Sequence, residues 1–194
     1  MRIGDFDLYS LSDGFFGLDG GAMFGVVPRP LWEKTNPPDD RNRIRLALRP
    51  LLIVAGPNRV LVDTGIGNKW DIKGRDIYRI EKTETLDGSL ARLRLTPEDI
   101  THVVLTHLHF DHAGGATRLD SNGQSVPSFP NARYLIQRTE WEDAVRPNRR
   151  SRAAYLPENF LPLEEAGLLQ LVNGTTEVMP GIELLHVGGH TRGL

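Results

Sequence analysis

The chain has 194 residues, a length that suits one domain with a buried core, since most domains contain about 100–200 residues. A net charge of −2 at pH 7 argues against a nucleic-acid partner and against binding to an acidic membrane surface. The chain contains no cysteine, which excludes disulfides, thiolate metal sites and a cysteine nucleophile. Any metal ion must therefore be held by imidazole and carboxylate groups.

The first third of the chain predicts strands separated by loops. Residues 2–11 alternate between apolar and polar side chains as a strand does, and a glycine-rich loop over 13–30 follows. A short helix is expected near Leu31–Lys34. The runs 44–56 and 59–65 are rich in strand-forming residues, and the Gly-Pro-Asn between them predicts a hairpin.

The rest of the chain predicts alternating helices and strands. Residues 65–84 show no period and are expected to form a loop. A helix is predicted over 87–94, with Asp87 or Ser89 near its start, and Thr96 before Pro97 suits a further helical start. The remaining predicted elements are strands at 102–107, 132–137 and 182–187 and helical segments at 139–145 and within 155–172. Strands interleaved with helices predict an α/β or α+β fold.

No stretch approaches the length of a membrane span, and the first 14 residues lack the features of a secretory signal peptide. We therefore predict no membrane partner and a cytoplasmic location. The basic run Arg146–Arg152 is expected to be a solvated loop.

A cluster of histidines follows the predicted strand at 102–107. The sequence THLHFDHAGG contains His107, His109, Asp111 and His112 within six positions. Since side chains alternate along a strand, His107 and His109 are expected to point the same way. A set of surface or capping residues is the alternative, but buried polar groups at this spacing would each need a partner. Imidazole and carboxylate groups suit Zn²⁺, Fe²⁺ or Mn²⁺, so the cluster predicts a metal site.

This cluster resembles the H-x-H-x-D-H signature of the metallo-β-lactamase-fold hydrolases. Three further stretches occur in the order expected for that family: VLVDTG at 60–65, HVVLTH at 102–107 and VGGHTRG at 187–193. The resemblance implies an αββα sandwich. It also implies that residues 1–194 form one domain that is incomplete at its C-terminal side, with the first half of the fold and part of the second.

The resemblance implies two metal ions in a complete site, most often zinc. The first would be bound by His107, His109 and His190, and the second by Asp111 and His112. Asp111 would also be the catalytic residue, because it would help to position the attacking water.

Asp63 would orient a metal ligand through a hydrogen bond, although a simple turn aspartate before Gly65 is the alternative. His102 and His186 match no ligand position of the family. We expect both to be structural or to face solvent.

In the family, a hydroxide between the two metals attacks a carbonyl or phosphorus centre. With Phe110 in place, HLHFDHAGG resembles most the acyl-homoserine-lactone lactonase and organophosphate-hydrolase branches. Hydrolysis of a lactone or related ester of a small molecule is therefore the expected function. Thioester or phosphoester hydrolysis stays open, and so does a remnant that binds metal or dimerises without catalysis.

The second half of the family fold supplies a bridging aspartate and a final histidine, and neither follows His190 in this sequence. We therefore expect the chain to be the front of a longer enzyme. An apolar sheet face and a sheet edge would then be exposed, and a missing segment or a homodimer would cover them.

The large apolar side chains outside the predicted strands have either a packing role or a role at a substrate pocket. The glycine-rich segment 14–25 carries Phe15, Phe16, Met23 and Phe24, and it would be either an apolar lip over a substrate pocket or a packing or dimer loop. The three tryptophans are expected to pack in the interior: Trp32, Trp70 and Trp141.

Overall fold

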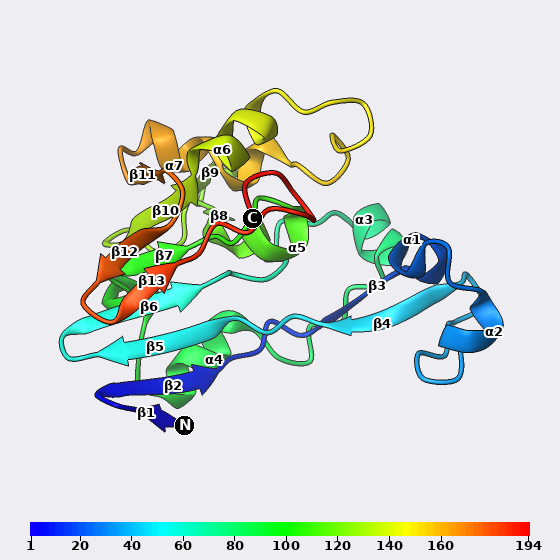
Figure 1. Cartoon of the computed structure of the whole chain (residues 1–194), viewed down its shortest axis with the longest axis horizontal. Coiled ribbons are helices and arrows are strands. Elements are labelled where there is room, and N and C mark those ends of the chain that lie inside the picture. The colour runs from blue at the N-terminus through cyan, green and yellow to red at the C-terminus, as the bar shows by residue number, and fades with distance from the viewer.

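The computed structural model describes residues 1–194 as a mixed α/β fold built around a seven-stranded sheet (Figure 1). The strands lie in the order β1 (Arg2–Ile3), β2 (Phe6–Ser10), β5 (Leu51–Ala55), β6 (Asn58–Val62), β7 (His102–Val104), β10 (Arg133–Gln137) and β11 (Leu169–Val172). The first four pair antiparallel, whereas β6, β7, β10 and β11 run parallel. The parallel strands all end at one edge of the sheet.

Three smaller sheets and seven helices complete the fold. The small sheets pair β3 (Phe15–Asp19) with β4 (Arg43–Ala47), β8 (Thr117–Leu119) with β9 (Ser125–Pro127), and β12 (Thr176–Met179) with β13 (Ile182–Leu184). The helices are α1 (Gly20–Phe24), α2 (Arg29–Trp32), α3 (Ile72–Ile77), α4 (Leu86–Arg92), α5 (Phe110–Ala113), α6 (Arg138–Val145) and α7 (Leu161–Glu165). Three 3-10 turns, Pro97–Asp99, Gly114–Ala116 and Pro157–Asn159, join them. No helix has both the length and the apolar character that crossing a membrane requires.

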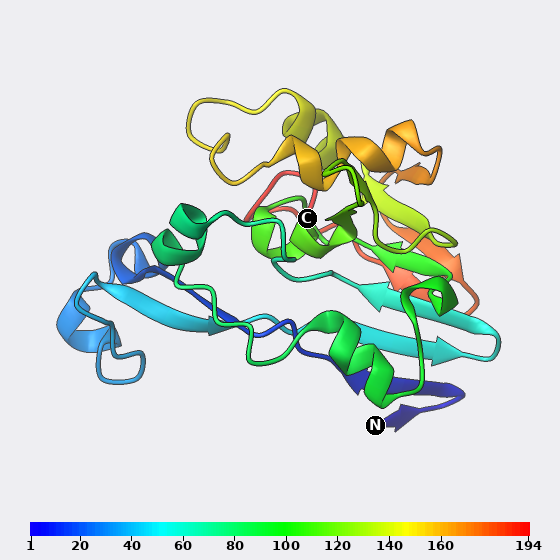
Figure 2. The ribbon, with the colours of Figure 1, turned by 180° about the vertical axis from the view of Figure 1, so that it is seen from behind.

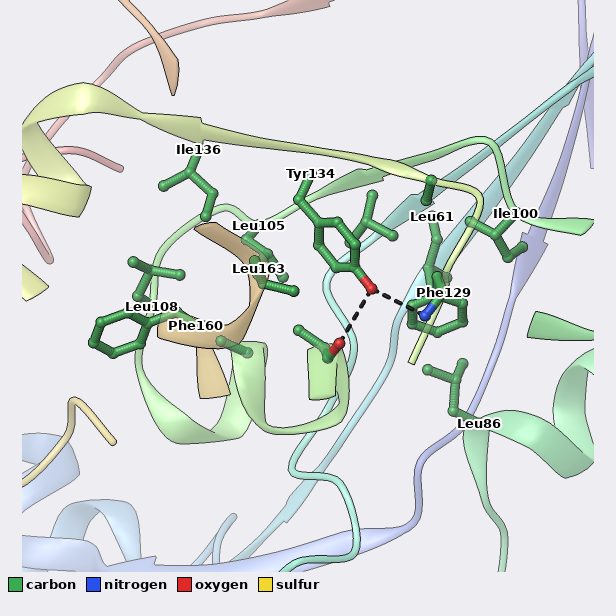
Figure 3. Close-up of a cluster of buried hydrophobic side chains, with 14 of the residues drawn as sticks. Leu61, Leu86, Ile100, Leu105, Leu108, Phe129, Tyr134, Ile136, Phe160 and Leu163 are labelled. Atoms are coloured by element: carbon green, nitrogen blue, oxygen red, sulfur yellow. Dashed lines mark hydrogen bonds between the residues drawn. The ribbon is translucent and has the colours of Figure 1, made fainter. Parts of the chain in front are cut away.

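The main core lies between the sheet and the helices. It contains apolar residues of α4, α6 and α7, such as Leu90, Ala144 and Leu163, packed against inward-facing residues of β6, β7 and β10. Figure 2 shows α4 against the rear of the sheet. Tyr134 is 0% exposed at the centre of this core, so its hydroxyl needs partners. It accepts a hydrogen bond from the Phe129 backbone N–H and donates one to the Ala116 carbonyl (Figure 3).

Removing that hydroxyl provides a test of this buried polar contact. Tyr134→Phe leaves the buried Phe129 N–H without its acceptor and removes one of the two donors to the Ala116 carbonyl, so we expect a loss of about 1–3 kcal/mol of unfolding free energy. Urea denaturation measures the loss. Tyr9→Phe on the exposed side of β2 is the matched control and should leave stability unchanged. Equal stability of the two variants would contradict the importance of the contact.

The opposite face of the sheet is covered by the β12–β13 hairpin. Its apolar side chains pack on a second cluster of buried residues from four neighbouring strands: Val60, Val104, Leu135 and Val172. The expectation of an exposed apolar face is therefore wrong for this part of the sheet, because the hairpin shields it. The predicted fold class, helices and strands around a large mixed sheet, is confirmed.

Several predicted elements of the first third differ from the structure. The strand expected over 2–11 is a hairpin of β1 and β2, because Gly4 turns the chain with a φ of +57°. The run 44–56 is split between two sheets, since β4 pairs with β3 while β5 pairs with β6. The predicted hairpin of β5 and β6 is confirmed.

Short elements account for most other differences. The expected loop 13–30 contains β3 and α1, and the expected loop 65–84 contains α3. The short helix expected near Leu31–Lys34 is present as α2 at Arg29–Trp32. The helix predicted over 87–94 begins at Leu86, and the Thr85 hydroxyl caps it by accepting from Gly88 N–H, in place of Asp87 or Ser89. The strands β8, β9, β11 and β12 were not predicted. Elements of three to six residues are too short to show a period in the sequence.

The arm formed by residues 15–47 extends away from the main sheet (Figure 1). Phe16 is buried and packs edge-on against Phe110, with ring centroids 6.4 Å apart. Met23 is 48% exposed, and Phe24 stacks on Trp32. The prediction that the tryptophans pack is confirmed: Trp32 and Trp141 are buried, and Trp70 packs on Tyr78 and Phe110.

Candidate metal centre

The candidate site lies where two adjacent parallel strands end. Because β6 and β7 end at the same edge of the sheet, Asp63 after β6 lies beside the histidine segment after β7. Asp63 accepts hydrogen bonds from the backbone N–H and the hydroxyl of Thr106, at 2.9 Å for each. These contacts fix the start of the segment that carries the signature.

The histidines themselves do not lie on a strand. Since β7 ends at Val104, His107 lies in the loop that follows, and His109 is the residue before α5. The expected alternation along a strand is therefore wrong for this pair. The two imidazole rings nevertheless meet, with centroids 4.7 Å apart, because the loop turns the chain back into α5.

His107, His109 and His190 form a group in which one nitrogen of each ring lies within 4.8 Å of the others. His190 Nε2 lies 3.1 Å from His109 Nδ1. His107 is 3% exposed, and its Nε2 atom is buried without a hydrogen-bond partner. Leaving a buried polar nitrogen unpaired is costly, and a metal ion would satisfy it. The residues therefore fit a divalent metal ion.

Asp111 and His112 lie directly beside this group. The ring centroids of His112 and His107 are 4.0 Å apart. His112 Nε2 lies 3.3 Å from Asp111 Oδ2, while His112 Nδ1 lies 2.8 Å from Asp63 Oδ2. The structure thus brings all six predicted site residues together, with Asp63 in contact with His112.

The environment gives the histidines different protonation behaviour. Burial, aided by the neighbouring histidines, lowers the pKa of His107 to about 3, so this ring is neutral and able to bind a metal at neutral pH. Burial also lowers the pKa of His109. Burial alone would lower the pKa of His112, but hydrogen bonds to Asp111 and Asp63 outweigh it and raise the pKa to about 10.

These differences predict a titration of the metal-free protein that ¹⁵N NMR can follow. His112 should stay protonated until the pH approaches about 10, whereas His107 should stay neutral down to about pH 3. A metal ion at Asp111 and His112 must then displace a proton, so metal uptake should release acid. If both pKa values lay near the ordinary histidine value, the burial of His107 and the hydrogen bonds of His112 to Asp111 and Asp63 would both be contradicted.

The other two histidines do not join the cluster. His102 Nδ1 lies 2.9 Å from the hydroxyl of Thr101 at the start of β7. His186 is exposed, and its Nε2 lies 2.9 Å from the Arg192 carbonyl oxygen. Both agree with the structural or solvent-facing positions expected from the sequence.

Sequence reasoning missed Glu140, a fully buried residue of α6 next to the cluster. One carboxylate oxygen accepts hydrogen bonds from the Leu108 backbone N–H and the Tyr155 hydroxyl. The segment 139–145 predicted a helix but not which of its acidic residues is buried. No signal in the local sequence separates the buried Glu140 from the exposed Glu142 of the same helix.

The cavities of the molecule do not all lie at this site. A cavity of about 290 Å³, lined by residues such as Asp13, Lys82 and Arg118, includes none of the clustered histidines. A smaller cavity of about 70 Å³ is lined by Asp63, Asp111 and His112 together with Phe16, Leu48 and Arg49. The small cavity therefore marks the side from which the Asp111–His112 pair can be reached.

A mixed sheet with a group of histidines and carboxylates at its strand ends defines an α/β protein with a candidate metal site. A model of the metallo-beta-lactamase superfamily matches residues 51–194, which is well over half of the chain. The chain belongs to the metallo-beta-lactamase superfamily, and the family predicted from its motifs is confirmed.

Curated relatives place the chain near one group of enzymes. N-acyl homoserine lactonase AiiA of Bacillus thuringiensis subsp. kurstaki is 31% identical over 145 residues, which cover 74% of this chain and 51% of the relative. N-acyl homoserine lactonase AttM of Rhizobium radiobacter is 30% identical over 128 residues, covering 64% of this chain and 43% of the relative. This chain spans about half the length of the curated relatives it matches.

Solved structures agree with this assignment. The crystal structure of a probable metal-dependent hydrolase from Staphylococcus aureus matches with a TM-score of 0.90 at 39% identity, covering 100% of this chain and 68% of that chain. An N-acyl homoserine lactone hydrolase with the product N-hexanoyl-L-homoserine at its catalytic metal centre matches with a TM-score of 0.69 at 26% identity. The match covers 96% of this chain and 67% of that chain.

Proposed function

We propose that this protein is a metal-dependent hydrolase that acts on a small-molecule lactone or a related ester. The observation that carries the proposal is the group of three histidines with its Asp111–His112 neighbour. The proposed metal ligands are His107, His109 and His190 for one ion and Asp111 and His112 for a second. Imidazole nitrogen and carboxylate oxygen favour zinc, although Fe²⁺ and Mn²⁺ also accept this set.

A divalent metal bound at such residues polarises a carbonyl oxygen and lowers the pKa of a bound water. The residues of the chain supply the positioning. Asp63 accepts from Nδ1 of His112 and so directs its Nε2 towards Asp111. Asp111 is the proposed catalytic residue, because its carboxylate can accept a hydrogen bond from the attacking water.

The choice of a lactone rests on the relatives and on the apolar side chains beside the signature. AiiA and AttM are N-acyl homoserine lactonases, and their matches cover 74% and 64% of this chain. The cavity beside Asp111 and His112 is lined in part by the apolar side chains of Phe16, Ala47 and Leu48. An apolar lining next to the proposed metal centre suits a substrate with an acyl chain better than a highly charged phosphoester.

Metal analysis and a substrate panel test the proposal together. Purified protein is stripped of metal, reloaded with zinc, analysed for bound zinc, and assayed with lactones, thioesters and phosphoesters. Two zinc ions per molecule and lactone turnover that needs zinc are the expected results. One ion or none without turnover would favour a metal-binding remnant, and faster thioester or phosphoester turnover would replace the lactone as substrate class.

We also propose that the protein can form a homodimer, which would cover the sheet edge that an incomplete fold leaves exposed. Sedimentation of the purified protein with and without zinc decides between a monomer and a dimer. A monomer at all concentrations would remove the dimer from the proposal without affecting the metal centre.

A further inference from the structure

Glu140 is an unusual residue for the interior of this protein. Its side chain is 0% exposed, and no Lys or Arg forms an ion pair with it. Oε1 accepts hydrogen bonds from Leu108 N–H at 2.8 Å and from the Tyr155 hydroxyl at 3.1 Å. Oε2 is buried and has no partner. A buried carboxylate without a counter-ion is costly, so packing alone does not explain its presence.

The two hydrogen-bond partners of Glu140 both adjoin the metal-binding histidines. Leu108 is the residue between His107 and His109, so the bond to its N–H fixes the backbone that joins the two ligands. The Tyr155 ring lies against the His109 ring, with centroids 4.9 Å apart, and the two residues form an isolated β-bridge. Glu140 therefore holds the His107–His109 loop through the backbone and through the ring that packs on His109.

The helix that carries Glu140 also seats the third histidine. The backbone of Gly193, three residues after His190, passes so close to Glu140 that a Cβ atom there would overlap the backbone of α6. Arg192 donates two hydrogen bonds to the carboxylate of Asp143, at 2.8 and 3.1 Å. Figure 1 shows this C-terminal segment next to α5. Both loops that bring the three histidines together are thus fastened to α6.

We propose that Glu140 is a positioning residue that holds His107 and His109 in the geometry that binds the metal ion. This inference rests on the proposed metal centre but not on the identity of the substrate. Partners that orient metal ligands contribute strongly to metal affinity, and their loss typically costs about 10–100-fold. Glu140 acts through the hydrogen bonds that Oε1 accepts and not through the volume of its side chain.

Zinc affinity of the purified protein, measured by competition with a chromogenic chelator, tests the proposal. Glu140→Ala is expected to weaken zinc binding by about 10–100-fold, because the Leu108 N–H and the Tyr155 hydroxyl lose their acceptor. Glu140→Gln retains an amide oxygen for both donors and should recover most of the affinity. Glu165→Ala, at an exposed position at the end of α7, is the control and should bind zinc as the wild type does.

Thermal unfolding of the metal-free variants separates positioning from simple stability. A lower Tm of Glu140→Ala with unchanged zinc affinity would mean a purely structural role and overturn the inference. Equal weakening by Gln and Ala would overturn the hydrogen-bond mechanism. If Glu140→Ala does not fold, Tyr155→Phe removes one donor and keeps the ring on His109. Its Co²⁺ absorption spectrum should then change, and an unchanged spectrum would refute the proposal.

The wild type is measured in the same experiment. If it binds no zinc, the metal centre and the inference fail together. If it binds zinc with the same affinity as Glu140→Ala, only the inference about Glu140 fails.

Discussion

His109→Ala is expected to reduce zinc-dependent hydrolysis by about 1,000-fold or more, which corresponds to a loss of about 4 kcal/mol of transition-state stabilisation. The reason is geometric. His109 Nδ1 faces His190 Nε2 at 3.1 Å, and its ring adjoins that of His107, so its removal takes one of the three proposed ligands from the first metal position. The kcat/KM for a lactone, together with bound zinc per molecule, measures the effect.

His102→Ala serves as the control for loss of an imidazole. His102 lies at the start of β7 and contacts Thr101, away from the cluster, so zinc content and kcat/KM should stay near the wild-type values. If His109→Ala retains both its zinc and its rate, the three-histidine group is not the catalytic centre. A loss of rate with full zinc content would instead assign His109 a role other than metal binding.

The sequence pointed to the candidate ligands because most of them are close together along the chain. His107, His109, Asp111 and His112 fall within six residues, and so many imidazole and carboxylate groups directly after a buried strand are typical of a metal site. His190 lies 81 residues from His109, and only the family resemblance connected the two. The structure places all five near one another.

Residues that support the ligands from a distance could not be predicted in this way. Glu140 is 32 residues from Leu108, and nothing in the local sequence distinguishes it from Glu142, which is exposed. Asp13 is 53 residues from the backbone N–H of Ile66 that it contacts. Such contacts depend on the packing of whole elements, which hydrophobic periodicity does not describe. The same limit explains why the sequence showed a strand at 102–107 but not the loop that shapes the cluster.

Asp13→Ala is expected to cause the largest loss of stability, about 3–5 kcal/mol, because it removes one partner of a buried ion pair. Asp13 is 3% exposed, and its carboxylate lies 2.5 Å from Lys82 Nζ. It also accepts hydrogen bonds from the backbone N–H groups of Ile66, Gly67 and Leu86, at 2.9, 3.0 and 3.2 Å. Without the carboxylate, three backbone donors lose their acceptor and the mostly buried Lys82 ammonium loses its counter-ion, keeping only its hydrogen bond to the main-chain carbonyl of residue 13.

Urea denaturation at neutral pH measures this loss, with Glu33→Ala as the control. Glu33 forms an exposed pair with Arg29, and removing such a pair should change stability by only about 0.3–0.5 kcal/mol. If Asp13→Ala loses no more than this control, the pair with Lys82 does not hold the fold together. Asp13→Asn keeps an acceptor for the backbone donors, so its loss of unfolding free energy should lie between those of Asp13→Ala and Glu33→Ala.

Asp13→Ala should also disturb the candidate metal centre, because hydrogen bonds connect the backbone near Asp13 to His112. Asp13 fastens residues 66–67, and the adjoining Thr64 donates hydrogen bonds from its N–H and its hydroxyl to the His112 carbonyl, at 2.8 Å for each. Gly115 N–H donates to the Gly65 carbonyl in the same segment, at 3.2 Å. Zinc bound by Asp13→Ala under conditions where it is folded should therefore fall at the proposed second position, where His112 is a candidate ligand, before it falls at the three-histidine group.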